Sequence, residues 1–316
     1  MLKGLYSNLS YGGKLLLLVI LLVSFLLFST LLAILLLVPF YGPQIFNLVS
    51  NPDLANSSVV NALKVIQIIN MALGLLFPAM LYAWLCTPDF KKYTGLKLSS
   101  TPVLLLLGAF IIIVAQPAIG WTNELNSHLK LPPALSSIEN WMRNAEDQGK
   151  LLTDAFLNSI SVTGLIVNVF MIAILPAIAE EFLFRGVLAN LFKDWTKNIH
   201  IAVLLSALIF AAIHLQFYGF LPRFLLGIIL GYLFFWSGSL WVPVAAHFTN
   251  NFLSVLIEFM YHKAWIGSNA ENFGNNASWG FIVISFLAVG VILFVVRNRT
   301  LANQTQVLVE DNADQK

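Results

Sequence analysis

Long apolar runs, separated by short polar stretches, follow one another along almost the whole chain. A helix needs about 20 mostly apolar residues to cross the roughly 30 Å hydrocarbon core of a bilayer. Segments that approach or exceed this length are Leu15–Phe40, Val65–Cys86, Val103–Ile119, Phe156–Phe192, Ile201–Leu215, Phe217–Trp236, Trp241–Met260 and Trp279–Val296. The pattern therefore predicts an all-α, polytopic bundle of about eight transmembrane helices.

Composition supports a membrane protein. Of 316 residues, 59% are hydrophobic and 10% are charged, against about 25% charged in an average soluble domain. The net charge of +2 gives no indication of nucleic-acid binding. The first apolar run is longer than the h-region of about 7–15 residues in a cleaved signal peptide, so we expect a retained anchor. Cys86 is the one cysteine, which excludes an intrachain disulfide.

Nine positively charged residues near the predicted spans fall on one side of the membrane, and the opposite loops are poorer in positive charge near the spans. These are Lys3, Lys14, Lys91, Lys92, Lys97, Lys193, Lys197, Arg297 and Arg299. Because cytoplasmic loops are enriched in Lys and Arg, this side is predicted to be the cytoplasm, with both termini inside. Arg223 and Glu258 lie near the outer ends of their spans and are interpreted as interfacial. We expect an integral protein of a bacterial inner membrane.

Three regions are predicted along the chain. Residues 1–150 comprise the N-terminal spans and an extracytoplasmic loop, 151–300 form the core, and 301–316 form a disordered polar tail. In the loop, Ser137 is predicted to cap a short interfacial helix that carries Ile138, Trp141 and Met142 on one face.

The stretch AEEFLFRG, residues 179–186, places three charges in six residues of an apolar run. A charge at the centre of a span costs about 2.5–3.5 kcal/mol on insertion scales, unless it is paired or functional. Glu181 and Arg185 stand at i and i+4 and can neutralise each other. Glu180 points about 100° away and stays available as a base. Pro176 is expected to free a backbone carbonyl and kink the span. Alternatively, these charges mark the cytoplasmic end of the span.

Two histidines, His214 and His247, also lie within apolar runs, and Asn251 shares a helix face with His247. A single intramembrane histidine is usually a hydrogen-bonding residue between helices. Two of them, with Glu180 on a third span, indicate a common site. Zinc held by Glu180, His214 and His247 is one option. The other is a metal-free water deprotonated by Glu180, with the oxyanion stabilised by His247 and Asn251.

Together, the motifs EEFLFR, FAAIH and HFTNN resemble those of the CAAX-processing protease and bacteriocin-processing (CPBP, or Abi) family of intramembrane endopeptidases, over roughly residues 155–260. The resemblance implies that Glu180 activates water with help from His214, that His247 and Asn251 stabilise the oxyanion, and that Glu181 and Arg185 form a supporting pair. It also implies an intramembrane catalytic cavity open to the cytoplasm.

The resemblance leaves the metal dependence undecided, so zinc stays an option rather than an expected cofactor. The implied partners are the lipid bilayer and a membrane-associated peptide or protein substrate, which in some family members is lipidated. The alternative function is a non-catalytic membrane protein, such as an immunity factor, that binds a ligand in the same cavity. A proton-coupled transporter would predict inverted repeats, and the sequence shows no internal repeat.

Overall fold

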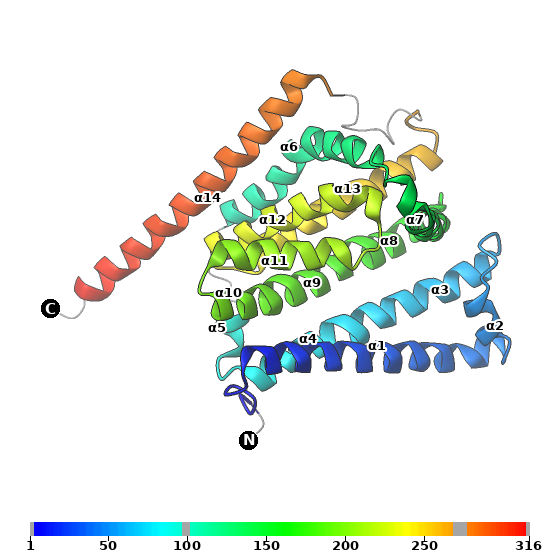
Figure 1. Ribbon diagram of the computed structural model, residues 1–316, viewed down its shortest axis with the longest axis horizontal. Helices are drawn as coiled ribbons and strands as arrows, with labels where there is room; N and C mark the ends of the chain where they lie inside the picture. The colour runs from blue at the N-terminus through cyan, green and yellow to red at the C-terminus, as the bar shows by residue number, and fades with distance from the viewer. Residues whose placement is uncertain (1–2, 97–101, 268–276, 314–316) are drawn as a thin grey trace.

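The computed structural model describes residues 3–96, 102–267 and 277–313, with side chains described up to Arg299. Within these residues the chain forms helices and turns, with no strand. The helices pack side by side into one bundle, and α1 begins at the same end of the bundle at which α14 finishes (Figure 1). The predicted all-α class is confirmed.

Six helical stretches of the described chain are long and apolar enough to cross a membrane. They are α1 (Tyr11–Tyr41), the continuous α3–η1–α4 (Ser57–Ile69, Asn70–Leu76, Phe77–Cys86), α6 (Pro102–Ser127), the continuous run Val162–Thr196, η5 with α12 (Phe217–Gly219, Phe220–Ser237), and the first part of α14 (Trp279–Ala313). The chain is therefore an integral membrane protein with a polytopic helical fold.

All eight predicted segments are helical, but two of them do not meet the length and hydropathy of a full span. The fifth is α11 (Ile199–Ala212), whose 14 residues extend only about 21 Å at 1.5 Å per residue. The seventh is α13 (Trp241–His262), where histidine, asparagine and threonine side chains interrupt the apolar sequence. α13 carries His247 and Asn251 of the predicted site, and His214 lies in the turn after α11.

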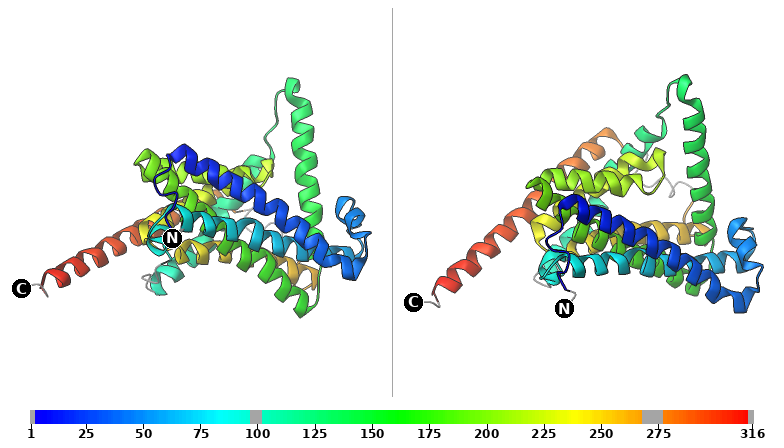
Figure 2. Two further views of the ribbon diagram at one scale, coloured as in Figure 1. Left: turned by 90° about the horizontal axis from the view of Figure 1, so that it is seen from below. Right: turned by 60° about the horizontal axis from the view of Figure 1, so that its bottom comes forward.

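The outer loop folds differently from the prediction. After η2 (Pro133–Leu135), α7 runs from Ser136 to Leu157 and is 22 residues long rather than short. Leu135 holds the N-cap position, so Ser137 lies inside the helix and does not cap it. Phe156, predicted to begin the fourth span, belongs to α7. Figure 2 shows α7 standing away from the bundle.

The C-terminal tail also differs from the prediction. Disorder was expected from residue 301, but the backbone of α14 remains helical through Ala313. The sequence LANQTQVLVEDNA contains neither proline nor glycine, and each further residue adds a hydrogen bond to an existing helix at little cost. Lys97 and residues 314–316 lie outside the described residues.

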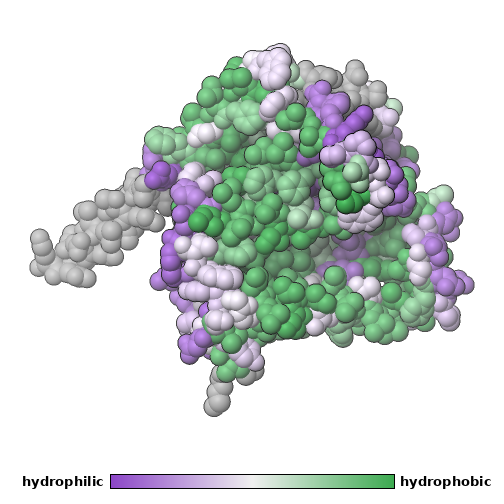
Figure 3. Space-filling view, viewed as in Figure 1, coloured by the Kyte–Doolittle hydropathy of each residue, from purple (hydrophilic) through white to green (hydrophobic). Residues whose placement is uncertain are grey.

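The surface matches a bilayer environment. Apolar side chains cover the middle of the face seen in Figure 3, and polar side chains gather towards its two ends. On α1, for example, Leu27 is 68% exposed. A whole helix face of such side chains would be unfavourable in water and is favourable in lipid. The remaining short helices, α2 (Ile45–Ser50) and α5 (Phe90–Thr94), lie between the long ones along the chain.

Candidate functional site

The helix that carries AEEFLFRG widens twice to a π-helix. It begins as α8 (Val162–Asn168), widens to a π-helix in η3 (Val169–Ile174), returns to α-helix in α9 (Leu175–Glu181), widens again in η4 (Phe182–Ala189) and ends as α10 (Asn190–Thr196). π-Helical turns are rare and concentrate at functional sites. Both glutamates stand at the last α-helical turn before η4.

The Glu181–Arg185 pair predicted from its spacing is present and fully buried. Arg185 Nη1 donates to Glu181 Oε1 at 2.7 Å, and the two side chains are 1% and 0% exposed. Arg185 Nη2 donates to the carbonyl of Gly227 on α12 at 3.1 Å. The guanidinium also lies 4.8 Å from the ring centre of Phe210, in the range of a cation–π contact. These contacts tie η4 to α11 and α12.

Glu181 has a second partner, His247 of α13. His247 Nδ1 lies 2.8 Å from Glu181 Oε1, so the imidazole donates its Nδ1 proton to the carboxylate. The other ring nitrogen, Nε2, is then free to accept a proton. Glu181 Oε2 is buried and makes no described hydrogen bond. Glu181 is thus the residue that orients His247.

Glu180 lies between the two histidines. Its Oε2 is 3.9 Å from His247 Nε2 and 4.0 Å from His214 Nε2. These atoms come from α9, from α13 and from the turn after α11. The separations are longer than a direct hydrogen bond and suit groups that contact one shared water molecule. The structure therefore brings Glu180, His214 and His247 together, as the sequence predicted.

His214 is oriented by the end of its own helix. Its Nδ1 lies 2.6 Å from the carbonyl of Phe210, so Nδ1 carries the proton and Nε2 faces Glu180. Its side chain is 28% exposed and that of Glu180 is 12% exposed, whereas His247 is only 4% exposed. The cluster is consequently accessible at the His214 edge and closed at the His247 edge.

This open edge lies at the end of α11 that is distant from Lys197. The adjoining loop is covered by α7: Glu146 Oε2 accepts the Tyr218 N–H at 2.8 Å, and the rings of Trp141 and Phe217 are 5.3 Å apart. If the lysine-rich loops are cytoplasmic, the edge faces the opposite side. The charge-based orientation and the cytoplasmic opening implied by the family resemblance therefore conflict.

Asn251 does not contact the Glu180 cluster through its described hydrogen bonds. Its Nδ2 donates to the Ile172 carbonyl in η3 at 3.0 Å, and its Oδ1 accepts from Asn250 at 3.2 Å. Ile172 stands four residues before Pro176, which has no N–H to offer a carbonyl in the preceding turn. Asn251 thus satisfies a carbonyl near the proline, and its described partners do not include Glu180 or His214.

Two residues to which the sequence analysis assigned no role in the site also lie around the cluster. Phe210 contacts both histidines, with ring centres 4.9 Å from His214 and 5.9 Å from His247. Arg223, interpreted as interfacial, is close enough to Glu180 for their charges to interact and bonds to Gln216 and the Gly219 carbonyl. Arg223, like Glu180, is a charged residue inside an apolar run, so the cost of placing a charge there could have identified both residues.

The predicted zinc ligands do not form a metal site in this arrangement. Among the described residues, no three His, Cys, Asp or Glu side chains are grouped so that they could hold a metal ion. Zinc binds at about 2.0–2.2 Å from nitrogen and oxygen ligands, which would require Glu180 to move closer to both histidines. We derive no step through zinc.

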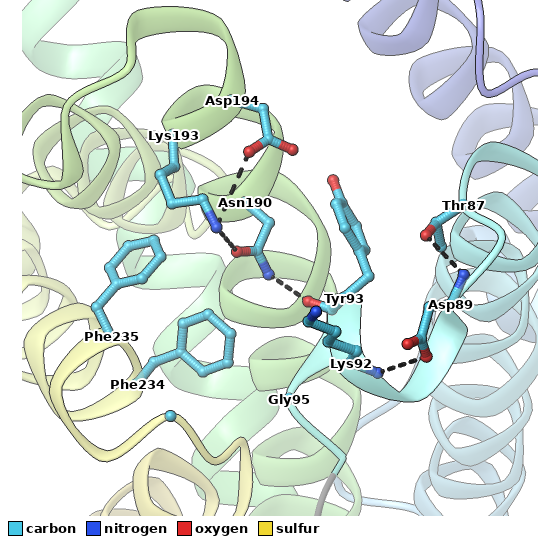
Figure 4. A pocket seen from close by; sticks show the side chains of 11 residues that line it. Thr87, Asp89, Lys92, Tyr93, Gly95, Asn190, Lys193, Asp194, Phe234 and Phe235 are labelled. Atoms are coloured by element: carbon cyan, nitrogen blue, oxygen red, sulfur yellow. Dashed lines mark hydrogen bonds and ion pairs between the residues drawn. The ribbon is translucent and has the colours of Figure 1, made fainter. Parts of the chain in front are cut away.

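At the other end of η4, a cavity of about 420 Å³ lies between α5, α10 and the end of α12 (Figure 4). Its polar groups are largely satisfied by one another. Asn190 Nδ2 donates to the Tyr93 carbonyl at 2.7 Å and its Oδ1 accepts from Lys193 at 3.2 Å. Burial of Tyr93 raises the pKa of its phenol. This network fixes the end of η4.

Comparison with known proteins agrees with the geometry. Residues 162–253 match the family model described as Rce1-like, type II CAAX prenyl endopeptidase Rce1-like. The matched segment contains the whole Glu180 cluster, from α8 to α13. The match lies within the region, roughly residues 155–260, over which the three motifs resemble the CPBP family.

Two curated relatives are similar over part of the chain. An 85-residue stretch is 36% identical to "Uncharacterized protein YpbD" of Bacillus subtilis (strain 168), covering 26% of this chain and 40% of that protein. A 102-residue stretch is 33% identical to "Uncharacterized 24.3 kDa protein" of Escherichia coli, covering 30% and 46%. The chain therefore matches less than half the length of each relative. No solved structure matches it.

Proposed function

We propose that this protein is an intramembrane endopeptidase that hydrolyses a peptide bond with a water molecule activated by Glu180. One observation carries the proposal: Glu180 Oε2 lies 3.9–4.0 Å from the Nε2 atoms of two histidines on other helices. A carboxylate with two imidazole nitrogens around one water-sized position is a suitable arrangement for deprotonating water.

Each histidine contributes through the nitrogen that faces Glu180. The Phe210 carbonyl holds the Nδ1 proton of His214, so His214 Nε2 accepts a hydrogen bond from the water and helps to hold it. Glu180 takes the proton as the water oxygen attacks the carbonyl carbon. Protonated Glu180 then gives the proton to the leaving amine, which restores the carboxylate.

The Glu181–Arg185 pair acts on the reaction through His247. Arg185 donates to Glu181, and Glu181 accepts the Nδ1 proton of His247. A His247 that has taken a proton from solvent at Nε2 would donate to the developing oxyanion, and the Glu181 carboxylate would stabilise the imidazolium. One N–H of the Asn251 side-chain amide donates to the Ile172 carbonyl. The other N–H is the one that we propose as a second donor to the oxyanion.

The substrate is proposed to be a membrane-associated peptide or protein, lipidated or not, because the cluster lies within the membrane-spanning bundle. The proposed location is a bacterial inner membrane with both termini cytoplasmic, in line with the positive charge near the spans. The alternative, a non-catalytic binding or immunity protein, would use the same cluster without needing Glu180 as a base.

The test compares cells that carry the natural protein with cells that carry Glu180→Gln, which keeps the shape and removes the base. New chain ends in the membrane and secreted proteomes are mapped by mass spectrometry. We expect particular termini to disappear in Glu180→Gln at equal protein level. Glu124→Gln is the matched control, since Glu124 is exposed on α6 and its substitution should leave every terminus in place.

Unchanged termini in Glu180→Gln, with the cellular phenotype intact, would contradict the peptidase and favour the binding protein. If termini do disappear in Glu180→Gln, the cleavage that produces them is next measured for the natural protein in isolated membranes treated with EDTA. Continued cleavage supports Glu180 acting without zinc, whereas loss of cleavage that added Zn²⁺ restores would revive the metal-bound option.

A further inference from the structure

A polar cavity lies at the end of the bundle where α3 and α8 begin, outside the Glu180 cluster. Its volume is about 390 Å³. The start of α3, the end of α7 and the turn before α8 line it. Six of the lining residues carry hydroxyl or amide side chains: Ser57, Asn61, Asn158, Ser159, Ser161 and Thr163. None of the motif residues takes part, so the peptidase proposal does not explain this cavity.

Lys64 is the one charged side chain among the described residues that line this cavity. It is 8% exposed, and its Nζ donates to Asn168 Oδ1 at 2.8 Å. Asn168 is itself 3% exposed. An ammonium has three donors, and within the described part of the chain no carboxylate lies within ion-pair distance of Lys64. A buried cation without an opposite charge is strongly unfavourable, so an anion bound in the cavity would stabilise the Lys64 ammonium.

Acidic residues close in sequence do not supply that charge. Asp53 Oδ1 accepts the Ala55 N–H at 3.1 Å, and neither Asp53 nor Asp154 lines the cavity. The lining therefore combines one ammonium with several neutral hydroxyl and amide donors. This combination fits a phosphate group, whose oxygens accept several hydrogen bonds, at least one of them charge-assisted.

An apolar strip continues from the cavity along α8 and η3. Val162, Ile166 and Phe170 follow one another at four-residue spacing and are 67%, 64% and 44% exposed. Val167, 37% exposed, lines the cavity itself. A free phosphate ion would gain nothing from this strip. A phospholipid would, because its acyl chain can lie along the strip while its headgroup enters the cavity.

We propose that this cavity binds the phosphate of an anionic phospholipid, with Lys64 as the counter-ion and the surrounding hydroxyl and amide groups as further donors. The lipid would join α3 to α8, and thus the N-terminal helices to the helix that carries Glu180. The proposal does not rest on the peptidase activity, because Glu180→Gln should bind the lipid as the natural protein does.

The test uses the purified full-length protein in detergent micelles containing either phosphatidylglycerol or phosphatidylcholine. Bound lipid is measured by native mass spectrometry and the unfolding temperature by a thermal scan. We expect phosphatidylglycerol to bind and to raise the unfolding temperature. Lys64→Met should weaken this binding about tenfold or more. Lys150→Met, at an exposed position on α7, should not change it.

Two further variants keep the test decisive if Lys64→Met folds poorly. Lys64→Arg retains the charge and should retain the lipid, while Asn61→Ala removes one cavity donor without touching the Lys64–Asn168 contact and should weaken binding less. Equal binding of phosphatidylglycerol by the natural protein and all Lys64 and Asn61 variants would overturn the proposal. Stabilisation by inorganic phosphate alone, with no retained lipid, would contradict the proposal that the phosphate belongs to a phospholipid and would indicate a site for free phosphate.

Discussion

At the residue scale, neighbouring carboxylates have different surroundings. Glu181 is fully buried and shared between Arg185 and His247, whereas Glu180 is 12% exposed and faces two imidazoles at distances that leave room for water. The turn of about 100° between consecutive helical residues causes this difference. One carboxylate is thereby committed to structure, and the other is the one that we propose as the base.

Asn251 gives a prediction at this scale. Asn251→Ala leaves the Ile172 carbonyl without its described side-chain donor, and an unsatisfied buried polar group costs about 1–3 kcal/mol. We expect a lower unfolding temperature together with slower cleavage. Asn123→Ala, exposed on α6, is the control. If cleavage slows and the unfolding temperature stays unchanged, Asn251 acts as an oxyanion donor rather than as the partner of Ile172.

At the element scale, the site depends on how closely α11 and α12 approach each other. A Cβ at Gly227 would lie 2.9 Å from the Cβ and 3.0 Å from the Cα of Ala207, so the two helices touch through their backbones. The Gly227 carbonyl also accepts from Arg185. Because His214 follows directly after α11, any shift of that helix moves His214 relative to Glu180.

Gly227→Ala is therefore expected to impair both stability and activity. Overpacking of this kind typically costs about 1–3 kcal/mol, and the displaced α11 should slow cleavage as well. Gly290→Ala is the matched control, since Gly290 lies in α14 and nothing lies within 4 Å of the position a Cβ would take. Equal unfolding temperatures and cleavage rates for the two variants would show that α11 and α12 can separate without consequence.

At the scale of the whole molecule, the direction in which the site opens follows from the topology. The accessible edge of the cluster, at His214, lies beside the loop that α7 covers. The distribution of Lys and Arg predicts that α7 lies on the side opposite the cytoplasm, whereas the family resemblance implies a cytoplasmic opening. The bundle itself is compatible with both, because its two ends are polar and its middle is apolar (Figure 3).

Cysteine labelling decides between these orientations. In a Cys86→Ser background, Asp147→Cys on α7 and Lys91→Cys on α5 are both at exposed positions. With a membrane-impermeant maleimide and intact cells, we expect Asp147→Cys to react and Lys91→Cys to react only after lysis. The reverse pattern would contradict the charge-based orientation and would place the His214 edge on the cytoplasmic side.

The sequence by itself determined the membrane class, the helical fold and most helix positions, because twenty-residue apolar runs have few other structures available in lipid. It also determined the Glu181–Arg185 pair, since residues at i and i+4 meet on any helix. The clustering of Glu180, His214 and His247 was predictable in kind, because isolated ions inside a membrane are costly.

Only the tertiary structure decided the contacts between distant segments. Glu181 meets His247 across 66 residues and Lys64 meets Asn168 across 104, and no local periodicity encodes such pairs. The π-helical turns of η3 and η4 and the pairing of Asn251 with Ile172 likewise depend on how neighbouring helices pack. A sequence pattern fixes which face of a helix a side chain occupies, but packing decides which partner that face meets.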